Sequence, residues 1–126
     1  GDRLGGPFKV RGPHAFTVFF EFDSAALSPE SEQAMDAIAA TAKEGGLLHV
    51  IVGGHADRAG AASYNMALSR RRADAVTQGL VARGLRSELV AFNAFGETRP
   101  RVLTPDGLRE PRNRRVEVVI GSGQDL

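Results

Sequence analysis

Blocks of apolar residues along the chain predict four strands. Residues 16–22 are almost entirely aromatic or β-branched, which is typical of a buried strand. Residues 47–53 have the same character, and residues 88–95 predict a third strand with a mixed pattern. Residues 115–120 predict the last strand. The segment before it, residues 96–113, contains three prolines and is expected to be a long loop with a functional role.

Two helices are predicted between these strands. Ser28 is suited to cap a helix that begins at Pro29. The apolar stripe of this helix is Met35, Ile38, Ala39 and Ala42. The second helix is expected to span about residues 64–83, with Ser63 as its N-terminal cap and Gly84 at its C-terminal end. The order strand, helix, strand, helix, strand, loop, strand indicates an α/β domain whose strand–helix–strand units favour parallel neighbours.

Length and composition are those of one globular domain, with 126 residues, 42% apolar and 25% charged. A net charge of +1 argues against a dedicated nucleic-acid-binding protein, and the absence of cysteine excludes disulfides and thiolate metal sites. No stretch approaches the roughly 20 apolar residues that span a bilayer, so membrane association is expected only through a segment outside this chain. We expect residues 1–13 to be a linker, residues 14–121 the domain and residues 122–126 a polar tail.

The most specific feature is a glycine-flanked turn, residues 54–60, with Asp57 at its centre. The second helix follows at once. On a helical wheel of about 100° per residue, Asn65 and Arg72 fall on the face that should be apolar. An unpaired buried arginine costs several kcal/mol, so Arg72 needs a partner or an opening to solvent. Asp57 is the natural candidate for that partner.

Two interpretations of this pair are open. One is an internal salt bridge that joins the turn to the helix. The other is a ligand site at the carboxyl end of the second strand, where open sheets commonly bind ligands. Gly54 and Gly60 let the backbone approach closely, and Asn65 adds a donor and an acceptor, which favours the ligand site. An Asp/Arg pair suits a ligand that carries an ammonium and a carboxylate on one carbon.

A series of motifs extends this pattern over residues 16–120. In order they are Phe20-Glu21-Phe22-Asp23-Ser24 with Leu27, Gly54-His55-Ala56-Asp57 with Gly60, Tyr64-Asn65, Leu68-Ser69, Arg72-Ala73, Gly96-Glu97 with Pro100, and Asn113-Arg114-Arg115-Val116-Glu117. With these motifs the chain resembles the OmpA-like C-terminal domain, a family that includes the periplasmic domains of OmpA, Pal and MotB. The resemblance implies an α/β (α+β) fold of order βαβαββ, with the helices packed on one face of a four-stranded mixed sheet.

The resemblance also implies a function. It is non-catalytic, non-covalent binding of the meso-diaminopimelate stem peptide of peptidoglycan, which anchors a parent outer-membrane or envelope protein to the cell wall in the periplasm of a Gram-negative cell. Carried over to this chain, Asp57 receives the ammonium, and Arg72 and Arg114 hold the carboxylate. The remaining ligand-binding positions are Asn65, Ala59 and Leu68. The resemblance permits a dimer and requires no cofactor.

Functions of other classes are alternatives. One is a protein-interaction module of an envelope or motor complex with a vestigial pocket. A metal site at His55 and Asp57 would need a third ligand, His49 or His14, and the side chain of His49 is expected about 20 Å away along the strand. A hydrolase would need a nucleophile elbow that the sequence lacks. We therefore expect neither a metal nor an enzyme, and we expect His55 to pack and to hydrogen-bond the turn.

Exposure of several other side chains is also predicted. Arg70 and Arg71 are expected on a solvated face of the second helix. The residues expected in the core are Phe16, Phe19, Phe20 and Phe22. Phe92 and Phe95 are expected on different sides of the third strand, and one of them is a candidate to line the pocket.

Overall fold

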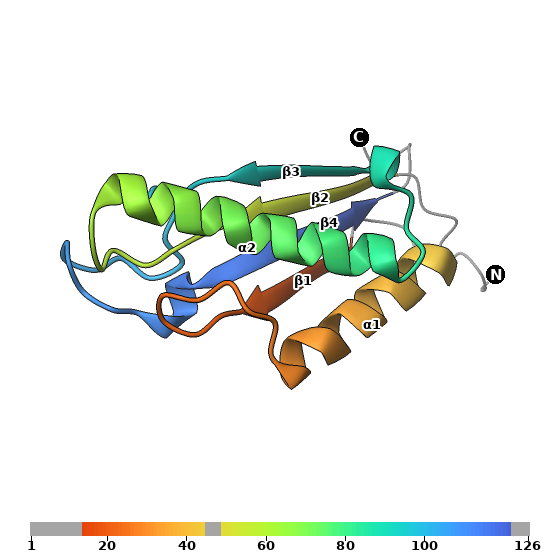
Figure 1. Cartoon of the computed structure of the whole chain (residues 1–126), viewed down its shortest axis with the longest axis horizontal. Coiled ribbons are helices and arrows are strands. Elements are labelled where there is room, and N and C mark those ends of the chain that lie inside the picture. Colours follow the sequence, from red (N-terminus) through yellow and green to blue (C-terminus); the bar gives the residue numbers. More distant parts are fainter. Residues whose placement is uncertain (1–13, 45–48, 122–126) are drawn as a thin grey trace.

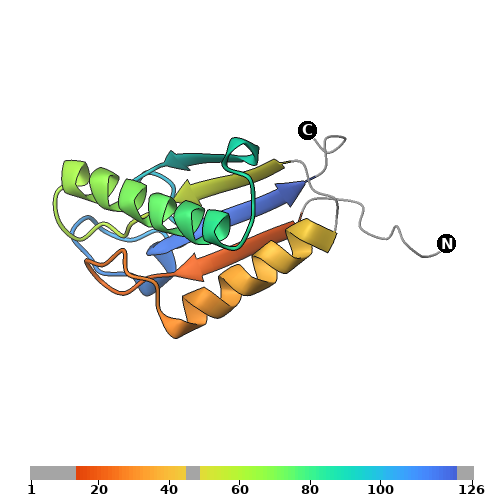
Figure 2. The ribbon, with the colours of Figure 1, turned by 45° about the vertical axis from the view of Figure 1, so that its right-hand side comes forward.

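The computed structural model describes residues 14–44 and 49–121. Its elements are β1 (His14–Phe19), α1 (Pro29–Glu44), β2 (His49–Gly54), α2 (Ala62–Ala82), β3 (Val90–Ala94) and β4 (Arg115–Gly121), with 3-10 turns at Ser87–Leu89 and Pro111–Asn113. Both helices lie on one face of the sheet, with α2 across β2 and β3 and α1 beside β1 (Figures 1 and 2). This arrangement confirms the predicted fold class.

The four strands form one mixed sheet in the order β1-β4-β2-β3. β4 is antiparallel to both of its neighbours, and only β2 and β3 are parallel. The prediction of parallel neighbours is therefore right for β2 and β3 and wrong for β1 and β2, because β4 lies between them. Val116, Val118 and Ile120 of β4 are at most 4% exposed, a degree of burial that suits a central strand.

The core lies between the sheet and the two helices. The predicted stripe of α1 is buried in full: Met35, Ile38, Ala39 and Ala42. β1 ends at Phe19, earlier than predicted, and Asp23 turns the chain with a φ of 53°. Phe20 is buried, whereas Phe19 and Phe22 are 48% and 38% exposed. The core prediction is wrong for these two, since Phe19 points to the open face of the sheet and Phe22 lies in the loop beyond it.

The ends of the helices differ in how they are capped. The Ser31 amide donates to the Ser28 hydroxyl at 3.0 Å, which confirms the predicted cap of α1. α2 starts earlier than predicted, and its N-cap residue is Ala61, which offers no side-chain hydrogen bond. The prediction of Ser63 as cap is therefore wrong. At the other end Gly84 follows the helix with a φ of 101°, as its predicted role requires.

The end of β2 lies very close to α2. A Cβ atom added to Gly54 would lie 2.0 Å from the Ser69 carbonyl oxygen. Only a glycine permits this contact, which holds the turn after β2 against the first half of α2. The predicted linker at residues 1–13, the predicted tail at residues 122–126 and the first two residues of the strand predicted over 47–53 lie outside the described residues. Neither described helix combines the length and apolar character needed to cross a membrane.

Candidate ligand-binding site

A pocket of about 260 Å³ opens between the turn after β2 and the first turns of α2. Its lining consists of Phe22, Asp23, Asp57, Ala59, Gly60, Ala61, Tyr64, Asn65 and Leu68. Four of the six predicted site residues are in this lining: Asp57, Ala59, Asn65 and Leu68. The structure thus brings together predicted positions from the turn and from the helix. Arg72 and Arg114 are not part of the lining.

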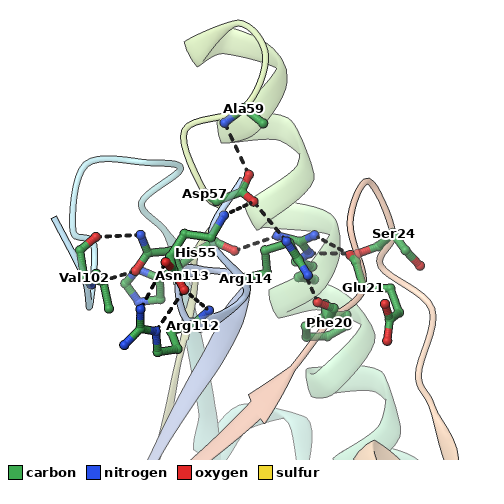
Figure 3. Close-up of polar contacts among 12 residues, drawn as sticks. Phe20, Glu21, Ser24, His55, Asp57, Ala59, Val102, Arg112, Asn113 and Arg114 are labelled. Atoms are coloured by element: carbon green, nitrogen blue, oxygen red, sulfur yellow. Dashed lines mark hydrogen bonds and ion pairs between the residues drawn. The ribbon is translucent and has the colours of Figure 1, made fainter. Parts of the chain in front are cut away.

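Asp57 is the buried carboxylate in the pocket wall, with only 4% of it exposed, whereas the other carboxylate of the lining, Asp23, is exposed. The Oδ2 of Asp57 accepts from the Glu110 amide at 3.0 Å and from Arg114 Nη1 at 3.2 Å. Its Oδ1 accepts from the Ala59 amide at 3.3 Å (Figure 3). The carboxylate therefore joins its own turn to the long loop before β4. A buried carboxylate is costly without hydrogen-bond donors, and these three donors satisfy it.

Arg72 does not pair with Asp57, contrary to the prediction. Its guanidinium is fully buried and donates to three backbone carbonyls, those of Ser24, His55 and Glu21, at 2.8 to 3.0 Å. Burial lowers the pKa of Arg72 to about 10, and the nearby Asp57 charge opposes that shift. The prediction of a buried guanidinium on this face of α2 is confirmed. Its partners were not foreseeable because carbonyls leave no signal in a sequence.

Arg114 is the ion-pair partner of Asp57. It is 8% exposed, and its Nε also donates to the Phe20 carbonyl at 3.1 Å. The family resemblance implies that Arg114 holds the ligand carboxylate together with Arg72. In the structure its Nη1 is engaged with the carboxylate (Figure 3), so the positive charge lies against Asp57 and outside the pocket lining.

Asn65 is held by a residue to which sequence reasoning gave no role. Its Nδ2 donates to Glu97 Oε1 at 2.9 Å, and Arg58 Nε lies 3.6 Å from Glu97 Oε2. Arg58 also donates to the Thr104 carbonyl at 3.1 Å. The link from the pocket to the long loop therefore runs through Glu97 and Arg58. The Gly96-Glu97 motif is the sequence signal that could have indicated a role for Glu97, because it begins the loop predicted to be functional.

The long loop is ordered by a buried amide. Asn113 is 0% exposed; its Oδ1 accepts from the amides of Arg101 and Val102, and its Nδ2 donates to the Val102 carbonyl. Farther along, the Arg109 guanidinium lies 3.5 Å from the ring centre of Phe22, a cation–π contact at the pocket rim. The loop is thus a fixed part of the site.

His55 lies on the opposite side of the sheet from the helices, stacked on Phe95 with ring centres 5.2 Å apart. It is buried, as predicted, but its Nδ1 has no hydrogen-bond partner among the described residues. The expected hydrogen bond from this side chain to the turn is therefore wrong. Burial and the charge of Arg115 lower the pKa of His55 to about 4.

The remaining exposure predictions have mixed outcomes. Arg70 and Arg71 are exposed, as expected. Phe92 packs against the core and Phe95 against His55, which confirms that they face different sides of β3. Neither ring lines the pocket. Within residues 14–44 and 49–121, no group of three or more His, Asp or Glu side chains is arranged to hold a metal ion.

Known proteins of similar sequence include peptidoglycan-associated lipoproteins and an outer membrane protein A. The peptidoglycan-associated lipoprotein of Pseudomonas aeruginosa is 39% identical over 102 residues, covering 81% of this chain and 60% of the relative. Outer membrane protein A of Bordetella avium is 36% identical over 106 residues, covering 83% of this chain and 55% of the relative. The chain therefore spans little more than half the length of these curated relatives.

Solved structures show the same fold. The OmpA-like domain of FopA1 from Francisella tularensis matches with a TM-score of 0.77 at 27% identity, covering 87% of this chain and 73% of that domain. The peptidoglycan-associated lipoprotein of Burkholderia pseudomallei matches with a TM-score of 0.75 at 28% identity, covering 82% and 88%. The model of the OmpA family matches residues 19–114, which contain the whole pocket and the long loop. The chain belongs to the OmpA family.

Proposed function

We propose that the pocket at Asp57 binds the meso-diaminopimelate end of a peptidoglycan stem peptide without covalent chemistry, and so anchors the parent envelope protein to the cell wall in the periplasm. The observation that carries the proposal is a buried carboxylate in the wall of a pocket formed by the first turns of a helix. The similarity to peptidoglycan-associated lipoproteins and to the cell wall anchor of the T6SS from Pseudomonas aeruginosa supports it.

Asp57 retains the capacity to accept an ammonium group. A carboxylate offers about four acceptor sites, and three are used by the Ala59 amide, the Glu110 amide and Arg114. Oδ1, with one of these bonds at 3.3 Å, has room for another donor. A ligand ammonium at this oxygen would make a charge-assisted hydrogen bond, which is among the stronger polar contacts available to a protein.

The start of α2 supplies donors for the ligand carboxylate. Ala61 has no side-chain oxygen to cap the helix, so the amides of the first turn lack the partner that a Ser or Asp would give them. Gly60, Ala61 and Tyr64 all line the pocket. An anion at a helix N-terminus is stabilised by these amides and by the helix dipole. Arg72 and Arg114 add positive charge behind Asp57, so neither needs to bond the ligand carboxylate directly.

Asn65 and Leu68 complete the pocket. The Oδ1 of Asn65 accepts no hydrogen bond from the described residues, which leaves it available to a peptide amide. Leu68 contributes an apolar wall for the methylene chain of the ligand. The alanines at positions 56 and 59 offer no hydroxyl. Compared with a side chain that hydrogen-bonds the ligand, each alanine should weaken binding by about 1 kcal/mol.

The proposal predicts a specific preference among peptidoglycan types. Diaminopimelate ends in an ammonium and a carboxylate on one carbon, whereas lysine offers only the ammonium. A lysine-type peptide leaves the donors of α2 without an anion and should bind more weakly by about 2 kcal/mol, roughly 30-fold. Isothermal titration with two soluble stem tripeptides that differ only in this residue measures the preference. Equal affinities would contradict the proposal.

A substitution of Asp57 tests the ammonium contact. Asp57→Asn should weaken binding of the diaminopimelate peptide by at least about tenfold, because a charge-assisted bond is lost. The matched control is Asp74→Asn, which changes an exposed carboxylate on α2. Both proteins should give the wild-type circular dichroism spectrum. If Asp57→Asn binds purified sacculi as the wild type does, the pocket is vestigial and a protein-interaction module is the better account.

A further inference from the structure

A second groove lies on the other side of Arg114 from Asp57. It has a volume of about 420 Å³ and runs along the end of β1, the start of α1 and the 3-10 turn before β4. Its lining is Thr17, Val18, Phe19, Phe20, Glu21, Ser28, Glu30, Ser31, Ala34, Pro111, Arg112 and Arg114. It shares no lining residue with the pocket at Asp57.

β1 is an edge strand, and one hydrogen bond shows which of its residues bond to β4 and which face the free edge. The Phe20 amide donates to the Arg114 carbonyl at 2.9 Å, in the same register that pairs Phe19 with Arg115. Antiparallel residues alternate between those that bond to the neighbour and those that point away from it. Val18 therefore bonds to β4, and the amide and carbonyl of Thr17 point to the free edge. The bond from the Ser31 hydroxyl to the Phe19 carbonyl, at 3.4 Å, agrees with this phase.

The free edge and the groove coincide. Among the described residues no side chain or loop bonds to the amide or carbonyl of Thr17, and Thr17 is one of the residues that line the groove. An unpaired strand edge is a template for another extended chain. Beside that edge the lining includes the apolar residues Val18, Phe20 and Ala34, of which Ala34 is the one that is not fully buried, so an apolar side chain of a paired strand would meet an apolar neighbour there.

The charges around the groove favour a basic occupant. Both arginines of the lining already face carboxylates, since Arg112 Nε lies 2.9 Å from Glu110 and Arg114 Nη1 lies 3.2 Å from Asp57. Glu21 and Glu30 are exposed at the rim, and neither forms an ion pair with a described residue. The net charge that an incoming chain meets is therefore negative.

We propose that this groove is a docking site for an extended segment of a partner protein, with at least one lysine or arginine, that adds to the free edge of β1. Main-chain bonds to Thr17 give affinity, an apolar side chain enters the groove, and a basic side chain meets Glu21 and Glu30. The proposal is independent of the pocket at Asp57, because the two sites have separate linings.

Fluorescence anisotropy with labelled peptides tests the proposal. The probes are end-capped hexapeptides with valine at alternate positions and lysine, glutamate or serine between them. The lysine series should bind saturably and at least about tenfold more tightly than the glutamate series, because the rim is acidic. No saturable binding by any series, or equal binding by the lysine and glutamate series, would overturn the proposal.

Thr17→Pro separates strand addition from simple charge attraction. Proline removes the outward amide and obstructs an incoming strand, yet that amide takes no part in the ladder with β4, and edge strands tolerate proline. Affinity for the lysine peptide should fall about tenfold, while Thr17→Val, which keeps the amide, should bind as the wild type does. Unchanged binding by Thr17→Pro would exclude strand addition.

A charge reversal and amide chemical shifts test where on the protein the lysine peptide binds. Glu30→Lys should weaken lysine-peptide binding several-fold, and the amide signals of Thr17 and Ser31 should shift in nitrogen–proton spectra when the peptide is added. Thr17→Pro should bind the diaminopimelate tripeptide with wild-type affinity. That control also shows that the variant is folded, and it distinguishes failure of this proposal from failure of the proposed peptidoglycan function.

Discussion

The two halves of α2 use their buried faces in opposite ways. In the first half the buried side chains include Asn65, Ser69 and Arg72, and in the second half they include Val76 and Leu80. The second half packs in the apolar core, whereas the first half contacts backbone carbonyls and the walls of the pocket. Burial alone therefore does not indicate a structural or a functional role. What distinguishes the halves is whether each buried group has a hydrogen-bond partner or an apolar contact.

The arginines of α2 and its C-cap sharpen this comparison. Arg72 is fully buried and bonded to three carbonyls, and Arg83 bonds Glu32 and Asp36 of α1 at 2.6 and 2.7 Å. The partners of Arg83 are 49% and 71% exposed. Ion pairs in water contribute little to stability, while buried polar groups are costly when their partner is removed. Similar side chains on one element should thus differ several-fold in their effect on stability.

The largest effect is expected for Arg72→Met, which leaves the carbonyls of Glu21, Ser24 and His55 buried without their donor. Unfolding free energy should fall by about 3–5 kcal/mol, given 1–3 kcal/mol for an unsatisfied buried group and incomplete additivity. Urea denaturation measures it. Arg71→Met, at an exposed neighbouring position, is the control and should change stability by less than about 0.5 kcal/mol. A loss below about 1 kcal/mol for Arg72→Met would show that the carbonyls find other donors.

A second large effect is expected at the contact between β2 and the first half of α2. Gly54→Ala places a methyl group 2.0 Å from the Ser69 carbonyl oxygen, so the helix must move, at a cost of about 2–3 kcal/mol. Gly79→Ala is the matched change in the second half. There the nearest atom is the sulfur of Met35 at 2.5 Å, at the end of a flexible side chain. Its stability should stay within about 1 kcal/mol of wild type, since alanine also favours the helix. Thermal denaturation of both variants tests the contrast, and equal losses would contradict it.

The pH dependence of stability should report on His55. Its pKa is lowered to about 4 in the folded protein by burial and by Arg115, against about 6.5 for an ordinary histidine. The unfolded chain then binds the proton more readily, so stability is complete above about pH 6.5 and declines as the pH falls towards 4. Denaturation between pH 4 and 7 should show a shallower slope for His55→Gln than for the wild type. A wild-type slope in His55→Gln would contradict the assignment.

The smallest effect is expected for Arg83→Ala. Its bonds to Glu32 and Asp36 lie at the surface, so stability should fall by no more than about 1 kcal/mol. The loss should shrink in 0.5 M salt, because screening weakens the wild-type pairs. A salt-independent loss as large as that of Arg72→Met would remove the contrast between the buried Arg72 and the surface ion pairs of Arg83.

Local patterns predicted much of this protein. The stripe of α1, its Ser28 cap and the buried Arg72 and Asn65 all follow from a helical period of about 3.6 residues and from capping chemistry. Asp57 is a candidate site residue from the sequence because a carboxylate between glycines, directly after a buried strand, is an unusual combination. These features depend on residues within a few turns of one another, and such relations are readable from the chain.

The tertiary structure decided which distant groups meet. β4 lies between β1 and β2, and this order depends on pairing between strands far apart in the sequence, which no segment determines alone. The partner of Asp57 is Arg114, brought from 57 residues away by the loop that Asn113 orders, while Arg72 turned to carbonyls. Backbone acceptors are present at every position and so carry no sequence signal. Pairing between distant charges therefore depends on the folded path of the chain.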